Sequence, residues 1–152
     1  NFVICSGAKS ILDLSKTNEL LETLGITRIG YQTNYMPGFW YEETENKVDN
    51  RFDEIHEISS FLKLNENIEN KKSILIFNKV PLEKALNKND VEKWINNATI
   101  KADRNNISGK ELTPFLIKEI NEQSKNETLN ANTSLIINNA NLAGKIAKNF
   151  YS

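Results

Sequence analysis

A short apolar run in the middle of the chain constrains the fold most. Residues 73–78 read Ser-Ile-Leu-Ile-Phe-Asn and are bounded by lysines on both sides. Such a run is typical of a strand that is buried between covering helices. Residues 2–5, Phe-Val-Ile-Cys, have the same apolar, strand-like character at the start of the chain. The sequence therefore predicts a sheet that is covered by helices.

The segment between these two runs contains a strand-helix-strand unit. Residues 16–24 place three leucines on one helical face, and residues 26–32 have strand character. Strands joined through a helix by short connections run parallel, and their carboxyl ends meet at one edge of the sheet. We therefore expect Thr33 to lie at the same edge as Lys9, which follows the first strand.

The rest of the chain has mainly helical patterns. They begin near Asp53, at a capping box over residues 89–92, at a Thr-Pro pair over residues 113–114, and in one long segment over residues 129–150. Strands that alternate with helices and then give way to helices predict an α/β fold. We expect a layered α/β/α domain over residues 1–152, with a mixed β-sheet and C-terminal helices packed on that sheet.

Composition excludes two classes of partner. The 152 residues carry 19 basic and 20 acidic side chains, a net charge of −1, so the chain lacks the basic surface that nucleic acid or an anionic membrane attracts. No apolar run approaches the length of a membrane span. The single cysteine, Cys5, excludes an internal disulfide and agrees with a reducing compartment, so we expect a cytoplasmic protein.

The first residue, Asn1, is not a methionine and leads directly into the first apolar run. Domains seldom begin inside a central strand. We therefore expect this chain to be one piece of a longer polypeptide.

Lys9 is the strongest candidate for a catalytic residue. It follows the predicted first strand by a few residues, at the sheet edge where ligands of α/β proteins bind. A partly desolvated lysine close to helix amino termini has a more accessible free amine, which can attack carbonyls and form Schiff bases. A lone lysine after a strand is more often a surface loop residue, so the motif by itself favours that simpler interpretation.

Three other features have structural interpretations that compete with functional ones. The aromatic segment over residues 35–41 is more typical of a packed loop than of a lid over a base or sugar. His56, the only histidine, has no metal-ligand pattern around it and is expected to be an ordinary helix residue. Residues 109–113 form either a loop that binds an anion at a helix start or merely the cap of that helix.

Two asparagines share one face of the long final helix. Asn132 and Asn139 are seven residues apart, which corresponds to two helical turns. An asparagine side chain offers one donor group and one acceptor group, which match a uracil edge or a sugar hydroxyl. In a chain so rich in asparagine, solvent exposure is the simpler interpretation of both.

Several stretches together resemble one known family. Residues 3–13, Val-Ile-Cys-Ser-Gly-Ala-Lys-Ser-Ile-Leu-Asp, closely resemble the nucleophile motif of the pseudouridine-5'-phosphate glycosidases, also called indigoidine synthase A-like proteins. Further matches occur in the family's order at Gly30–Thr33, Pro37, Phe39, Gly109–Phe115, Asn132 and Asn138–Ala140. The resemblance covers essentially the whole chain but corresponds only to the later half of the family's length, so residues 1–152 are expected to be the C-terminal half of a single domain whose N-terminal half is absent from this chain. The chain departs from the family at Lys79, where relatives carry a proline in an Asn-Pro-Ile-Pro-like turn, so the geometry of that turn is in doubt.

The resemblance implies reversible cleavage of the C–C glycosidic bond of pseudouridine 5'-phosphate, giving uracil and ribose 5-phosphate. Lys9 is then the nucleophile that attacks the anomeric carbon as the sugar ring opens, and an iminium forms while the bond to uracil breaks. Asn132 is singled out as a substrate contact, most simply to the base, whereas Asn138 and Asn139 remain equally suited to structural hydrogen bonds.

The resemblance also implies parts that this chain lacks. The family uses a carboxylate as general acid, a lysine for the phosphate, and a divalent metal, usually manganese, held by an aspartate, all in the earlier half. We therefore assign no metal ligand here, expect the missing half as a partner, and expect the piece to be inactive alone. A homotrimer is implied as well.

Two alternatives remain. One is another Schiff-base lyase or aldolase acting on a sugar phosphate, and the other is a non-catalytic scaffold or oligomerisation fragment.

Overall fold

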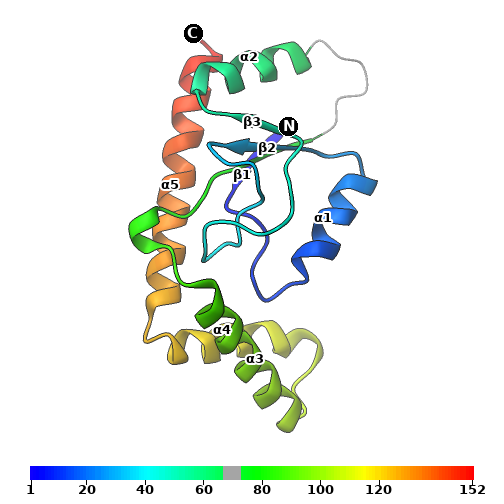
Figure 1. Cartoon of the computed structure of the whole chain (residues 1–152), viewed down its shortest axis with the longest axis vertical. Coiled ribbons are helices and arrows are strands. Elements are labelled where there is room, and N and C mark those ends of the chain that lie inside the picture. Colours follow the sequence, from blue (N-terminus) through cyan, green and yellow to red (C-terminus); the bar gives the residue numbers. More distant parts are fainter. Residues whose placement is uncertain (67–72) are drawn as a thin grey trace.

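The computed structural model describes residues 1–66 and 73–152. It has a four-stranded sheet in the order β1-β4-β2-β3, at the centre of the molecule (Figure 1). The strands are β1 (Phe2–Cys5), β2 (Thr27–Tyr31), β3 (Asn50–Phe52) and β4 (Ile74–Phe77). The predicted strand-helix-strand unit is confirmed, and β4 lies between the two strands that the unit contributes.

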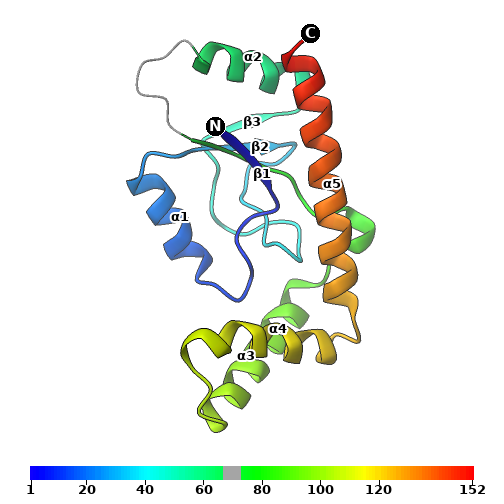
Figure 2. The same ribbon diagram turned by 180° about the vertical axis from the view of Figure 1, so that it is seen from behind.

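The described residues form five α-helices. They are α1 (Leu14–Thr23), α2 (Ile55–Glu66), α3 (Lys88–Arg104), α4 (Leu112–Gln123) and α5 (Glu127–Phe150). Single 3₁₀ turns, η1 (Leu82–Lys84) and η2 (Gly109–Glu111), precede α3 and α4. Figures 1 and 2 show α5 running along one side of the sheet from the α3–α4 pair at one end to α2 at the other.

The α/β class and the packing of α5 on the sheet are confirmed, but the expected mixed sheet is wrong. All three strand pairings within the sheet are parallel. The parallel neighbours β2 and β3 are joined by residues 32–49, which contain no helix. Among the residues that the structure describes, antiparallel pairing is confined to an isolated bridge between Tyr35 and Lys47, outside the sheet.

Two hydrophobic cores divide the molecule. The first lies between the sheet and helices α2 and α5, and its buried members are Ile29, Ile58, Leu62, Ile74, Ile76, Leu142, Ile146 and Phe150. The second joins the loop over residues 36–41 to helices α3, α4 and the start of α5, and it includes Trp40, Tyr41, Val80, Val91, Ala98, Leu116, Ile120 and Leu135. Helices α3 and α4 therefore pack on this loop and on α5, rather than directly on the sheet.

Helix α1 lies over the other face of the sheet but buries none of its residues. Leu20 and Leu24, which share one helical face, are 58% and 56% exposed. The contact with the sheet is polar instead: the buried Arg28 of β2 donates to Asn18 of α1 at 2.8 Å and pairs with Asp49 at 2.5 Å. This face of the sheet is therefore only partly covered.

Two helix starts differ from the predicted ones. Asn87 caps α3 by accepting a hydrogen bond from the Asn89 N–H at 2.9 Å, so the cap lies two residues earlier than expected. Helix α4 begins at Leu112, directly after η2, and Thr113 lies inside it. Within residues 1–66 and 73–152, no helix has both the length and the apolar content needed to cross a membrane.

Candidate active site

The carboxyl ends of the parallel strands bring three loops together. Residues 6–10 follow β1, residues 32–34 follow β2, and residues 78–79 follow β4. The middle of α5, at Asn138 and Asn139, lies against the first and third of these loops, as its hydrogen bonds show. This is the sheet edge at which α/β proteins bind their ligands.

The turn that precedes Lys9 requires a glycine. Gly7 has φ = +89°, a conformation that is strained for any other residue, and a Cβ atom there would overlap the backbone carbonyl of Pro37. The turn then continues through a hydrogen bond from the Leu12 N–H to the Lys9 carbonyl at 2.9 Å. The backbone on both sides of Lys9 is therefore in a defined conformation.

The aromatic segment over residues 35–41 forms hydrogen bonds with this turn. Ser6 accepts a hydrogen bond from the Phe39 N–H at 3.0 Å, and the Ser10 hydroxyl donates to the Gly38 carbonyl at 2.5 Å. Met36 is 1% exposed and Trp40 is 5% exposed, so the packed-loop interpretation is confirmed. The segment positions the Lys9 turn because it is itself part of a core.

Helix α5 also forms a hydrogen bond with this turn, through Asn139. The side chain of Asn139 donates to the Ser6 hydroxyl at 3.1 Å and accepts a hydrogen bond from the Asn78 amide at 3.0 Å. Asn78 also donates its backbone N–H to the Cys5 carbonyl at 2.9 Å. One amide group thus joins the loops that follow β1 and β4. Sequence reasoning left Asn139 open between substrate contact and structural hydrogen bonding, and the structure gives it structural partners.

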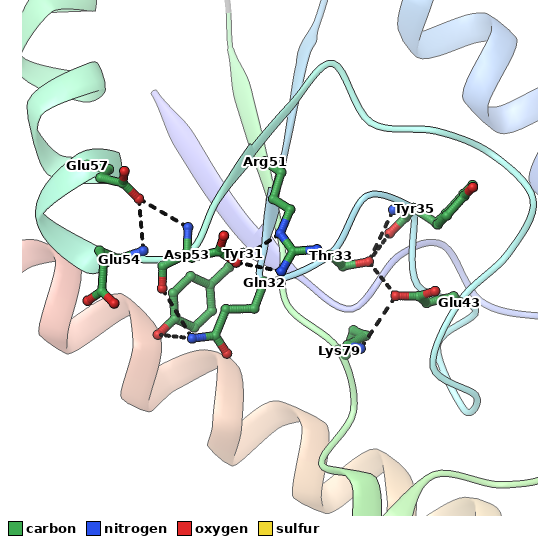
Figure 3. A network of polar contacts seen from close by, with 10 residues as sticks. All are labelled: Tyr31, Gln32, Thr33, Tyr35, Glu43, Arg51, Asp53, Glu54, Glu57 and Lys79. Atoms are coloured by element: carbon green, nitrogen blue, oxygen red, sulfur yellow. Dashed lines mark hydrogen bonds and ion pairs between the residues drawn. The ribbon is translucent and has the colours of Figure 1, made fainter.

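Lys79, the departure from the family pattern, has its own set of contacts. Its ammonium lies 3.4 Å from Glu42 and 3.4 Å from Glu43, and its carbonyl accepts a hydrogen bond from the Asn138 amide at 3.1 Å. Glu43 in turn accepts a hydrogen bond from the buried Thr33 hydroxyl at 2.8 Å, which links the loops after β2 and β4 (Figure 3). Lys79 therefore contributes ion pairs at this turn.

The loop after β3 is stabilised by a second group of polar residues, also drawn in Figure 3. Gln32, at φ = +56°, donates to the Asp53 carbonyl at 3.1 Å, and Arg51 pairs with the Asp53 carboxylate at 2.7 Å. The Glu57 carboxylate accepts hydrogen bonds from the N–H groups of Asp53 and Glu54 at the start of α2. These contacts are structural and lie on the β3 side, away from the Lys9 turn.

The structure corrects the expected surroundings of Lys9. Lys9 is exposed, and its side chain makes no hydrogen bond or ion pair with the part of the chain that the structure describes. The prediction that this chain itself shelters the amine is therefore wrong. The residues around Lys9 are short polar or glycine residues that fix its backbone, and none of them covers its side chain.

The expected substrate contact, Asn132, lies on the Asn139 face of α5, two turns closer to the start of the helix. It is half-buried, and within residues 1–66 and 73–152 its side chain has no hydrogen-bond partner. The amide of Asn132 is therefore available to a ligand. Because two turns span about 10 Å, Asn132 lies beyond the point where Asn139 joins the sheet edge.

Neither a metal site nor a reactive thiol is formed by this chain's described residues. No three His, Cys, Asp or Glu side chains come together there as ligands, and the carboxylates of Glu42 and Glu43 face the ammonium of Lys79. The residues present do not fit a manganese ion. Burial raises the pKa of the Cys5 thiol, which keeps it protonated. His56 is exposed on α2.

An α/β chain with a conformationally fixed lysine at the carboxyl edge of a parallel sheet belongs to a broad class of ligand-binding folds. Residues 1–149 match the family model described as indigoidine synthase A like protein. The chain belongs to the indigoidine synthase A-like family.

Relatives of this chain carry a more specific name. It is 44% identical to a pseudouridine-5'-phosphate glycosidase of Kosmotoga olearia over 95% of its own length and 50% of the relative. It is also 44% identical to a protein of the same name from Petrotoga mobilis, over 97% of its own length and 48% of the relative. The chain thus spans about half the length of the curated relatives it matches.

Two solved structures have the same fold. The prealnumycin C-glycosynthase AlnA, in complex with ribulose 5-phosphate, superimposes with a TM-score of 0.91 and 28% identity, over 98% of this chain and 49% of that one. An indigoidine synthase A-like protein from Thermotoga maritima superimposes with a TM-score of 0.84 and 34% identity, over 96% of this chain and 48% of that one.

Proposed function

We propose that this chain supplies the nucleophile-bearing half of a pseudouridine-5'-phosphate glycosidase. The observation that carries the proposal is the 44% identity to glycosidases of that name across almost the whole chain. The position of Lys9 at the carboxyl edge, on a turn held by Ser6 and Gly7, agrees with it.

In the proposed reaction, the Lys9 amine attacks C1′ of pseudouridine 5'-phosphate, and the bond from C1′ to the ring oxygen breaks as that oxygen takes up a proton. The nitrogen lone pair then forms a C=N bond as the C–C bond to uracil breaks, and uracil leaves with the bonding electrons and gains a proton. Water hydrolyses the resulting iminium, which releases ribose 5-phosphate and the free amine. An amine is suited to this bond because the leaving carbon offers no heteroatom for a general acid to protonate.

The substrate class has independent support. The AlnA structure, at 28% identity, is a C-glycosynthase in complex with a pentulose 5-phosphate, so a chain of this fold binds a sugar phosphate in connection with C–C glycosidic chemistry. We propose that the Asn132 amide contacts the uracil base, because it is half-buried and has no hydrogen-bond partner among the described residues. The remaining catalytic groups, including a general acid, a phosphate-binding lysine and a manganese ligand, belong to the complementary half. We further propose a cytoplasmic homotrimer.

Borohydride trapping tests the chemistry. The native protein, purified whole from the cells that make it, is incubated with ribose 5-phosphate and sodium borohydride, and the modified peptide is identified by mass spectrometry. Reduction of a Schiff base should fix the pentose phosphate on Lys9, and Lys9→Arg should abolish the adduct. The matched control is Lys16→Arg, since Lys16 is an exposed lysine seven residues away in α1.

The outcomes separate the candidate functions. Equal trapping of unrelated sugar phosphates, without release of uracil from pseudouridine 5'-phosphate, would indicate another Schiff-base lyase or aldolase. Unchanged turnover in the Lys9→Arg protein would leave Lys9 without a chemical role and would favour a scaffold.

A further inference from the structure

Strand β1 is an edge strand with the composition of a central one. Its four residues are all apolar, yet none of them is buried, and Phe2 and Val3 are 39% and 51% exposed. Its neighbour β4 is equally apolar but has three buried residues among its four. Natural edge strands are usually protected by charged residues, proline or bulges, and β1 has none of these.

The outer hydrogen-bonding groups of β1 are free to pair. Asn1 and Cys5 direct their carbonyl groups toward β4, where they accept hydrogen bonds from the N–H groups of Ile74 and Asn78. Backbone groups alternate sides along a strand, so the N–H and C=O groups of Phe2 and Ile4 point away from β4. Within the described residues no strand lies on that side.

An apolar groove continues this edge onto helix α5. The groove has a volume of about 210 Å³ and is lined by Phe2, Ile4, Asn139, Ala140 and Ala143. The alanines leave room for side chains of another segment. On the adjoining surface of α5, Ile136 and Ile137 are each 57% exposed. The edge and the helix surface therefore form one apolar region.

We propose that this region receives a β-strand from the polypeptide half that the relatives contain and this chain lacks, and that the strand continues the sheet at β1. The relatives are about twice as long as the matched segment, so one such half accompanies each copy of it in those proteins. A tethered segment has a high effective concentration and is favoured over a second copy of the chain. Added strands gain affinity from main-chain hydrogen bonds, and the outer groups of Phe2 and Ile4 supply these.

The added strand also accounts for the open surroundings of Lys9. Whichever direction it runs, one of its ends lies beside the turn over residues 6–9 that follows β1. A loop at that end would cover the amine, which this chain leaves exposed. This consequence rests on the proposed function of Lys9, whereas the pairing at β1 does not.

Hydrogen exchange at single amides tests the pairing. The amide of Ile4 is compared between the isolated 152-residue chain and the native protein purified whole from the cells that make it. We expect exchange to be slower in the native protein by about 100-fold or more, because the outward N–H becomes bonded and buried. Equal, rapid exchange of Ile4 in both would overturn the proposal. Slow exchange that appears in the isolated chain only as its concentration rises would also overturn it, since the occupant would then be a second copy.

A pair of matched variants keeps the test independent of activity. Val3→Lys places a charge on the free edge, and Leu20→Lys places the same charge on α1 at a residue of similar exposure. We expect Val3→Lys to lower the melting temperature of the native protein by several degrees more than Leu20→Lys, and the two variants to be alike in the isolated chain. The same effect of both variants in the native protein would contradict the pairing. Trapping on Lys9 is read out separately, so either proposal can fail while the other stands.

Discussion

The two outer strands of the sheet are built in opposite ways. Strand β3 has three residues, two of them the polar Asn50 and Arg51, and Arg51 is held by an ion pair with Asp53. Strand β1 has four apolar residues and an unpaired edge. A short, polar edge discourages further pairing, whereas an apolar one invites it. The comparison supports the proposal that a further strand pairs with β1 and not with β3, at the edge of the sheet where Lys9 follows β1.

The largest expected effect is a loss of turnover that follows substitution near β1 but not substitution in β3. Lys9→Arg removes the proposed nucleophile, because a guanidinium stays protonated and does not form a Schiff base. Turnover of pseudouridine 5'-phosphate by the native protein should fall on the order of 10⁴-fold or more, as steady-state uracil release would show. The matched substitution on the other side, Arg51→Lys, should change turnover less than about 2-fold, since surface ion pairs contribute little. Similar losses in both proteins would remove the functional half of the comparison.

The next effect concerns the stability of the turn after β1. Gly7→Ala introduces a Cβ at φ = +89° against the Pro37 carbonyl, so unfolding free energy should fall by about 2–4 kcal/mol. Gly109→Ala is the control, because Gly109 also has a positive φ of +60° but has open space around the position of a Cβ. Its cost should be about 1 kcal/mol. Urea unfolding of both variants measures the difference, and equal costs would show that the close approach to Pro37 has no effect.

A smaller effect should come from the contact between α5 and the β1 loop. Asn139→Leu leaves the Ser6 hydroxyl and the Asn78 amide without their partner, and the expected loss is about 1–3 kcal/mol of unfolding free energy. Asn139→Asp keeps the acceptor for Asn78 and should lose less. If Asn139→Leu changed stability by less than about 0.5 kcal/mol, the amide could not be what fixes this loop.

The smallest expected effect is a pH-dependent contribution of Asp49, the residue before β3, to the free energy of unfolding. Partial burial raises the pKa of Asp49, but the hydrogen bonds and charge of Arg28 outweigh burial and leave the pKa below its usual value. A carboxylate with a lowered folded-state pKa stabilises the protein above its unfolded-state pKa, and this contribution disappears as the pH falls through the folded-state value. Asp49→Asn should therefore be less stable than the unsubstituted protein near pH 7, and the difference should shrink progressively as the pH falls below about 4, the ordinary pKa of an aspartate.

The magnitude at neutral pH should be under about 1 kcal/mol, because the Asp49 side chain is 36% exposed and solvent screens the pair. Thermal unfolding at pH 7 and pH 3 checks both the size and the sign. A difference that grew in acid would show that Asp49 is not stabilised as a carboxylate.

Local patterns in the sequence determined most of the framework. The apolar run at residues 74–77, the strand at 27–31 and the long helix over 127–150 all follow from periodicity and turn chemistry, which depend on near neighbours. The same reasoning placed Lys9 and Thr33 at one sheet edge, since parallel strands share their carboxyl ends.

Other features depend on contacts between distant segments. The mixed sheet was predicted incorrectly and β3 was not predicted, because the pairing and direction of strands depend on how elements pack and not on their own periodicity. The starts of α3 and α4 also lie earlier than predicted, because Asn87 caps α3 and α4 continues directly from η2.

The sequence by itself predicted that Lys9 is the nucleophile and determined that this residue follows a strand. Only the tertiary structure decided which residues fix the turn that carries Lys9 and how exposed the Lys9 side chain is. Asn139 is 133 residues from Ser6 in the chain but within hydrogen-bond distance in space, and no spacing rule links them. The sequence pattern likewise did not predict the exposure of Lys9 or the free edge that β1 has among the described residues, because burial depends on every segment that packs nearby.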